Sequence, residues 1–121
     1  MTLERLYEKI GGNYHSIMER LGKEERVNKY VLLFLRDGSY NTFLQAVEQG
    51  DIQEAFRAIH TLKGVCMNLS FEELYQLSSE VTEYLRVEDL SRAMAALPSL
   101  ERCYQKHVAQ ISAYENSQNG I

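Results

Sequence analysis

The sequence predicts an all-α protein, an up-down four-helix bundle with short additional N-terminal helices. Apolar residues recur three and four positions apart along most of the chain, which is the spacing of amphipathic helices, and the alternation typical of strands is almost absent. Short turns join the predicted helices, and helices joined in this way pack as antiparallel neighbours. With 121 residues and 45% apolar content, we expect one domain over residues 1–121.

The N-terminal part of the chain predicts two short helices and one longer helix. The short helices cover Leu3 to Ile10 and Asn13 to Leu21, and the pair Gly11-Gly12 separates them. The longer helix runs from about Glu24 to Arg36, where Asp37-Gly38-Ser39 interrupts the apolar pattern. We expect the short helices to be additions to a bundle core of about residues 24–115.

The next two helices are marked by glycine and by a capping box. A helix from Tyr40 to Gln49 is expected to end at Gly50, because glycine suits the left-handed position just after a helix. Asp51 and Glu54 form the capping box that begins the following helix. The apolar residues of that helix follow 3.6-residue spacing and predict one buried stripe, formed by Ile52, Ala55, Phe56, Ile59, Leu62, Cys66 and Leu69.

A second capping-box pattern follows this stripe. Ser70 and Glu73 have the required spacing, so Ser70 is expected to be an N-cap. This assignment ends the preceding helix near Leu69 and begins another helix that runs to about Arg86.

The last predicted helix begins after Asp89, a suitable N-cap, and reaches about Tyr114. Pro98 is expected to kink or break it, because proline removes one helical hydrogen bond. Residues 116–121 are expected to form a loose tail.

Charge and hydropathy exclude several classes of function. The net charge is -4 and no Lys/Arg cluster occurs, which argues against nucleic-acid and anionic-membrane partners. The longest apolar run, Val31 to Leu35, is too short to span a bilayer, and the charged start lacks a signal-peptide core. We therefore expect a cytoplasmic location. We also expect a monomer, although nothing in the sequence specifies the oligomeric state. Cys66 and Cys103 lack metal-type spacing and are expected to be buried free thiols.

Three residues of the helix after Asp51 suggest chemistry at its surface. His60 follows the apolar Ile59 but lies off the buried stripe, and Lys63 and Gly64 come beside it one turn later. A neutral imidazole nitrogen is a competent nucleophile near neutral pH, and a lysine at i+3 places a cation where phosphoryl oxygens would lie. Glycine at i+4 leaves space for a second protein, although it lowers helix stability by about 1 kcal/mol relative to alanine.

The segment Ala58 to Gly64, AIHTLKG, resembles the His-x-x-Lys-Gly signature of histidine-containing phosphotransfer (HPt) proteins, and the likeness extends from about Val31 to Tyr104. The resemblance implies a carrier without kinase activity or a nucleotide site, phosphorylated on His60. It assigns phosphoryl stabilisation to Lys63 and partner access to Gly64.

The partners implied by the resemblance are response-regulator receiver domains and sensor histidine kinases. It implies no cofactor on this chain, since Mg²⁺ belongs to the acidic pocket of the receiver. Met67 stands where the family often has a small residue, and Ser70 stands where it often has glycine. Met67 could narrow the docking surface or supply a flexible apolar contact.

Other interpretations of these residues remain open at this point. His60 could be an ordinary surface histidine, Lys63 a surface lysine and Gly64 a site of close helix packing. The fold could also serve a binding module that regulates a receiver or kinase by occupancy alone. A bundle-type enzyme or metal carrier is a weaker alternative, because no Glu-x-x-His occurs. His15 and His107 have no charged or nucleophilic partner at comparable spacing and are expected to be surface histidines.

Overall fold

The computed structural model describes residues 1–119, which form helices and turns and contain no strand. The predicted all-α class is therefore confirmed. The elements in chain order are α1 (Leu3–Ile10), α2 (Tyr14–Leu21), α3 (Glu24–Leu33), the 3-10 turn η1 (Phe34–Arg36), α4 (Ser39–Glu48), α5 (Ile52–Leu69), α6 (Glu72–Arg86) and α7 (Leu90–Gln118).

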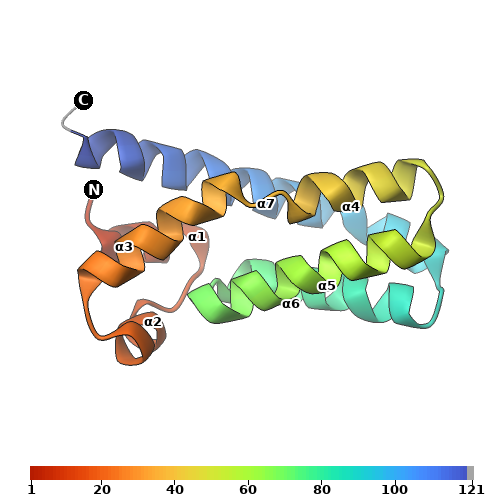
Figure 1. The fold of residues 1–121 in the computed structure, drawn as a ribbon, viewed down its shortest axis with the longest axis horizontal. Helices are drawn as coiled ribbons and strands as arrows, with labels where there is room; N and C mark the ends of the chain where they lie inside the picture. Colours follow the sequence, from red (N-terminus) through yellow and green to blue (C-terminus); the bar gives the residue numbers. More distant parts are fainter. Residues whose placement is uncertain (120–121) are drawn as a thin grey trace.

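Helices α4, α5, α6 and α7 form the antiparallel bundle (Figure 1). Helix α5 packs between α4 and α6, and α7 packs against α6 and, beyond the bundle, against α1. The N-terminus and the last turn of α7 lie at the same end of the molecule, where the Met1 amino group donates to Ser117 Oγ over 3.4 Å. None of the helices within residues 1–119 combines the length and apolar character needed to cross a membrane.

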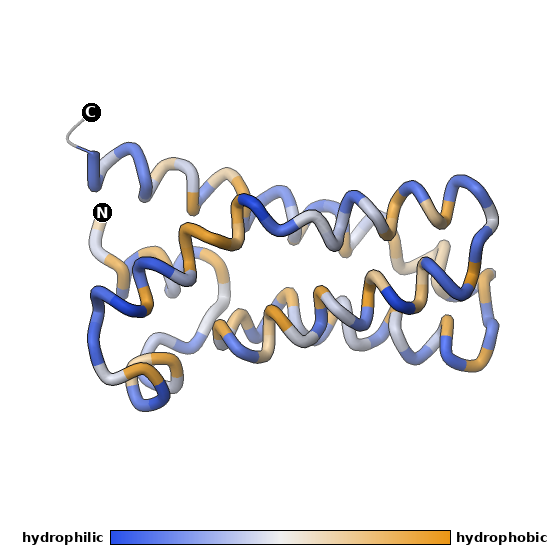
Figure 2. Tube along the Cα trace, in the orientation of Figure 1, coloured by the Kyte–Doolittle hydropathy of each residue, from blue (hydrophilic) through white to orange (hydrophobic). Residues whose placement is uncertain are grey.

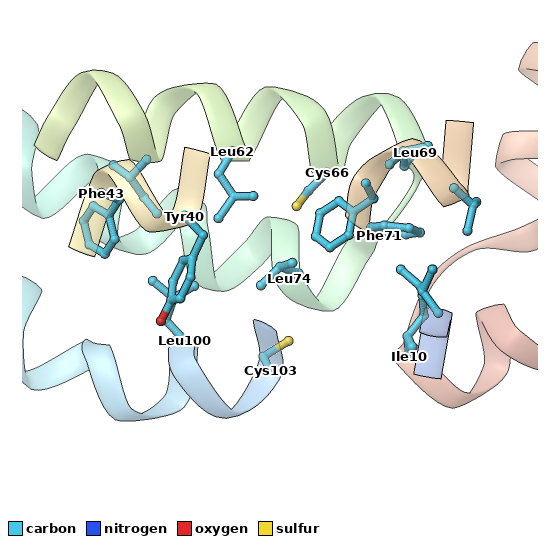
Figure 3. Close-up of a cluster of buried hydrophobic side chains, with 14 of the residues drawn as sticks. Ile10, Tyr40, Phe43, Leu62, Cys66, Leu69, Phe71, Leu74, Leu100 and Cys103 are labelled. Carbon is cyan, nitrogen blue, oxygen red and sulfur yellow. The ribbon is translucent and has the colours of Figure 1, made fainter. Parts of the chain in front are cut away.

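The core is continuous from the bundle into the N-terminal helices. Figure 2 shows hydrophobic residues recurring along each helix with hydrophilic residues between them. In Figure 3, Leu62 and Cys66 of α5 point toward Leu74 of α6 and Cys103 of α7. Both cysteines are buried and free, as predicted. Farther along, Phe71 packs edge-to-face against the ring of Phe34 at 5.3 Å between centroids.

Three predicted caps, at two turns, are confirmed. Asp51 accepts a hydrogen bond from the Glu54 amide at 3.1 Å and begins α5, and Asp89 accepts from the Arg92 amide at 3.1 Å and begins α7. Gly50, between α4 and α5, has a φ of 71°, the left-handed conformation expected after a helix.

The prediction that Ser70 is the N-cap of α6 is wrong. Ser70 has a φ of 57° and closes the C-terminus of α5 in the left-handed conformation. Its hydroxyl accepts from the Arg20 guanidinium and donates to Ser16 Oγ at 3.1 Å, so it is engaged away from α6. The Glu73 amide donates instead to the Gly11 carbonyl at 3.2 Å. Residues from α2 and the α1–α2 turn therefore replace the predicted capping box.

Three further predicted details, in α3 and α7, also differ. Proline does not break α7: Pro98 is exposed within a continuous helix, so the carbonyl that it leaves unpaired lies on the solvent side. The helix predicted to reach Arg36 ends at Leu33 and tightens into η1, a common ending for α-helices. Helix α7 extends through Gln118, so the predicted tail is helical up to that residue, and its last two residues lie outside the described ones.

Candidate functional site

His60 lies in the middle of α5, on the side of the helix that faces solvent. The preceding Ile59 is fully buried, and Leu62 two residues later is also fully buried, so α5 is anchored in the core on both sides of the histidine. Within residues 1–119, neither ring nitrogen of His60 has a hydrogen-bond partner. The imidazole is therefore open to a reactant approaching from solvent.

Lys63 and Gly64 lie one turn after His60 on the same exposed side of α5. Lys63 is half-buried, and its ammonium group forms no ion pair in the part of the chain that the structure describes. A Cβ atom built on Gly64 meets no described atom within 4 Å. Gly64 is therefore not at a close helix contact, which removes the packing explanation for this glycine.

An aromatic stack supports the imidazole from the preceding turn. The rings of Phe56 and His60 lie 5.7 Å apart between centroids with an interplanar angle of 27°. The guanidinium carbon of Arg86 on α6 lies 5.0 Å from the centroid of the same Phe56 ring. Phe56 is half-buried rather than part of a fully buried stripe as predicted, and so is Ile52 one turn earlier. Both residues pack against the core on one side and line a shallow pocket with Leu85 and Arg86 of α6 on the other.

An apolar groove borders the exposed face of α5 on the side of Gly64. Its volume is about 380 Å³, and residues of α2, α3, η1 and α5 line it. Val65 and Asn68 form its α5 wall, and Asn68 lies one turn after Gly64. Tyr30 and Leu33 of α3 form the opposite wall and are 46% and 47% exposed. We did not predict this groove, although both residues lie beside the apolar stripe of α3.

Met67 lies on the exposed face two turns beyond His60. Its side chain is 53% exposed. Its backbone carbonyl accepts from the Arg20 guanidinium at 2.8 Å, so the backbone at this position is fixed by α2 while the side chain is free. The polar centre of the site thus has apolar surface beyond it along α5.

The model of the family described as Hpt domain matches residues 39–114, from the start of α4 to near the end of α7. The matched segment covers more than half of the chain and includes the whole of α5. The chain belongs to the Hpt domain family. Hpt domains are histidine phosphotransfer carriers of two-component signalling rather than kinases, and they interact with receiver domains and kinases. Comparisons with curated proteins and with solved structures give no match.

The other two histidines of this Hpt domain differ from each other. His15 is exposed as predicted, but it has a charged partner that was not predicted, because its Nε2 lies 3.3 Å from Glu19 Oε1. His107 is fully buried, so its assignment as a surface histidine is wrong. It occupies the buried side of α7 with Leu100, Cys103 and Ile111, and this 3.6-residue stripe was the signal available in the sequence.

His107 lies beside a polar cluster of this Hpt domain, formed where α6 and α7 meet by Glu73, Cys103 and Lys106. Its Nδ1 lies 2.8 Å from the Cys103 carbonyl, and no partner of its Nε2 is found among the described residues. Burial lowers the pKa of His107 to about 4. The Cys103 thiol donates to Glu73 at 3.4 Å, and Lys106 pairs with the same Glu73 oxygen at 2.7 Å. Burial, aided by the Glu73 carboxylate, raises the pKa of the Cys103 thiol to about 12, so this thiol is a poor nucleophile.

Within residues 1–119, no group of three or more His, Cys, Asp or Glu side chains is arranged to hold a metal ion. The face around His60 offers the histidine itself, Lys63 at i+3 and the exposed Arg57 at i-3, and Arg57 pairs with Glu54. This set of groups suits a phosphoryl group better than a metal ion, because the cation complements phosphoryl oxygens.

Proposed function

We propose that this Hpt domain carries a phosphoryl group on His60 in a phosphorelay. It would accept the group from a receiver-domain aspartate or a sensor histidine kinase and pass it to the receiver domain of a response regulator. The observation that carries the proposal is the exposed imidazole of His60, which has no hydrogen-bond partner among residues 1–119, beside the open position of Gly64. Receivers and kinase cores act in the cytoplasm, so the proposal places this chain there.

The transfer step uses the lone pair of a neutral imidazole nitrogen of His60. That nitrogen forms a bond to phosphorus while the bond from phosphorus to the donor aspartate oxygen breaks, and the aspartate leaves as a carboxylate. The reverse exchange delivers the group to the acceptor aspartate. We assign Lys63 the role of stabilising the phosphoryl oxygens, since a nearby cation lowers the energy of charge that develops during transfer.

Partner access is the role that we assign to Gly64. A folded receiver must bring its phosphorylated aspartate, in an acidic pocket that would hold Mg²⁺, within bonding distance of the imidazole. A side chain at position 64 would project from the same surface as His60. Because glycine has no side chain, only backbone atoms lie beside the imidazole at this position. The groove next to it gives the partner apolar surface to bury.

The test is phosphate incorporation from a phosphorylated receiver domain. The wild-type chain should gain an acid-labile, base-stable phosphoryl group, and His60→Gln should gain none while keeping its helix content, because His60 is exposed. His15→Gln is the matched control, since it also removes an exposed histidine. Labelling of His60→Gln would refute the site. Partner binding by the wild type without any labelling would favour regulation by occupancy.

A further inference from the structure

The orientation of the His60 ring depends on a contact that the roles of Lys63 and Gly64 do not explain. We propose that Phe56 is a positioning residue, which holds the His60 imidazole in a fixed orientation for phosphoryl transfer. This inference rests on the phosphotransfer function proposed above. It adds a residue one turn before the histidine to the two residues that follow it.

The stack between the two rings limits the motion of the imidazole. An exposed histidine on a helix ordinarily samples several side-chain rotamers. Here the Phe56 ring lies 5.7 Å from the imidazole between centroids, with planes only 27° apart. Residues four apart on a helix lie one above the other, so this pairing is built into the register of α5. The contact uses a ring face, and both imidazole nitrogens stay unpartnered among the described residues.

Phe56 is itself held in place from a second helix. Its ring packs against the hydrophobic core, and the Arg86 guanidinium lies over it at 5.0 Å from the centroid. Arg86 is oriented in turn by Glu83, whose carboxylate accepts from Arg86 Nε at 3.2 Å. Arg86 of α6 therefore holds the Phe56 ring in place, and the Phe56 ring in turn holds the imidazole. The contact between Arg86 and Phe56 also joins α6 to the exposed side of α5.

Orientation matters for this reaction because the attacking nitrogen must line up with the bond that breaks. The lone pair of one imidazole nitrogen forms the N–P bond as the P–O bond to the donor carboxylate breaks, and the carboxylate leaves with the electron pair. Geometry fixed before the encounter removes part of the entropy barrier to such a transfer. Loss of the stack should slow transfer roughly three- to tenfold, in line with the size of an aromatic pair interaction.

The experiment compares Phe56→Leu with Phe56→Tyr, using two readouts. The first is the NMR chemical shift of the His60 ring protons, which a stacked aromatic ring displaces from the positions of the exposed His15. The second is the rate of phosphoryl transfer with saturating receiver domain. Tyr104→Leu is the matched control, because it removes another half-buried aromatic stack, with Tyr40 at 4.0 Å between centroids, on the far helix α7. Circular dichroism confirms that each variant is folded.

We expect Phe56→Leu to move the His60 ring protons toward the His15 positions and to slow transfer with little change in receiver binding. Phe56→Tyr keeps the ring and should restore both readouts, and Tyr104→Leu should change neither. His60 ring protons at the His15 positions in the wild type would overturn the proposal without any variant. An unchanged transfer rate in Phe56→Leu would also overturn it. So would a transfer rate in Phe56→Tyr as low as that in Phe56→Leu. A wild type with displaced ring protons but no phosphate uptake would overturn the phosphotransfer function itself, and this role with it.

Discussion

Acid should destabilise this protein through one buried side chain, His107. The ring is fully buried, and burial lowers its pKa to about 4 from an ordinary value near 6.5. Between these two values the unfolded chain binds a proton that the folded chain excludes. The free energy of unfolding therefore rises with pH across this window, and the contribution is fully present above about pH 6.5.

The size of the effect follows from the two pKa values. Protonation of the unfolded state alone lowers the free energy of unfolding by about 2 kcal/mol between pH 7 and pH 5. The neighbouring charges partly oppose each other, because Lys106 lowers the pKa of His107 and Glu73 raises it. The pKa of Glu73 is itself lowered, chiefly by Lys106. Its titration therefore changes the free energy of unfolding at pH values below this window.

The measurement is urea unfolding at pH 7 and pH 5 for the wild type and for His107→Phe. Phenylalanine keeps a ring that packs against Phe71, which lies 5.2 Å away between centroids, and it removes the titrating group. Between pH 7 and pH 5, the free energy of unfolding should fall by about 2 kcal/mol more in the wild type than in the variant. His107→Leu is a second variant in case the larger ring overpacks, and His15→Gln should behave like the wild type. An equal decrease in the free energy of unfolding in the wild type and in both His107 variants would refute the reasoning.

Two further predictions concern the functional face. Gly64→Gln should raise the free energy of unfolding by up to about 1 kcal/mol, because an added Cβ meets no described atom within 4 Å. Transfer from a receiver domain should fall sharply, and phosphorylation by a small non-protein donor should fall much less; parallel losses with both donors would contradict the access role. Lys63→Ala should slow transfer at saturating receiver more than it weakens receiver binding, with the exposed Lys9→Ala as control. An unchanged transfer rate would exclude the stabilising role of Lys63.

Local signals were sufficient to predict the helix that carries the site. Asp51 gives the observed start of α5 and the apolar stripe gives its buried face, because capping and 3.6-residue periodicity act within a few residues of sequence. The end at Leu69 agrees with the prediction, although the Ser70 capping box from which it was predicted is wrong. The exposure of His60 followed from the same periodicity. The roles of His60, Lys63 and Gly64 stay predictions, since geometry shows access to these residues and not transfer.

Features that depend on distant parts of the chain were not predicted. His107 was predicted to be a surface histidine because it has no charged or nucleophilic partner at comparable spacing, but its position in the buried stripe of α7 determines its environment. The groove beside α5 needs α3 to leave Tyr30 and Leu33 at the surface, which depends on how α3 packs against the bundle. The stack of Phe56 on His60 has the right spacing in sequence, but only the packed structure shows that both rings lie at the edge of the bundle.

Ser70 shows most clearly how distant contacts determine a local conformation. A left-handed backbone is unfavourable for a non-glycine residue by about 1 kcal/mol or more. Three neighbours from the first two helices offset this: Tyr7 donates to the Leu69 carbonyl at 2.8 Å, the Asn13 amide to the Ser70 carbonyl at 2.8 Å, and Arg20 to the Ser70 hydroxyl. All three donors lie outside the segment that matches the Hpt domain. The N-terminal helices thus hold the end of α5 where glycine would otherwise suffice. Because Arg20 also binds the Met67 carbonyl, they fix the backbone at one edge of the face that presents His60.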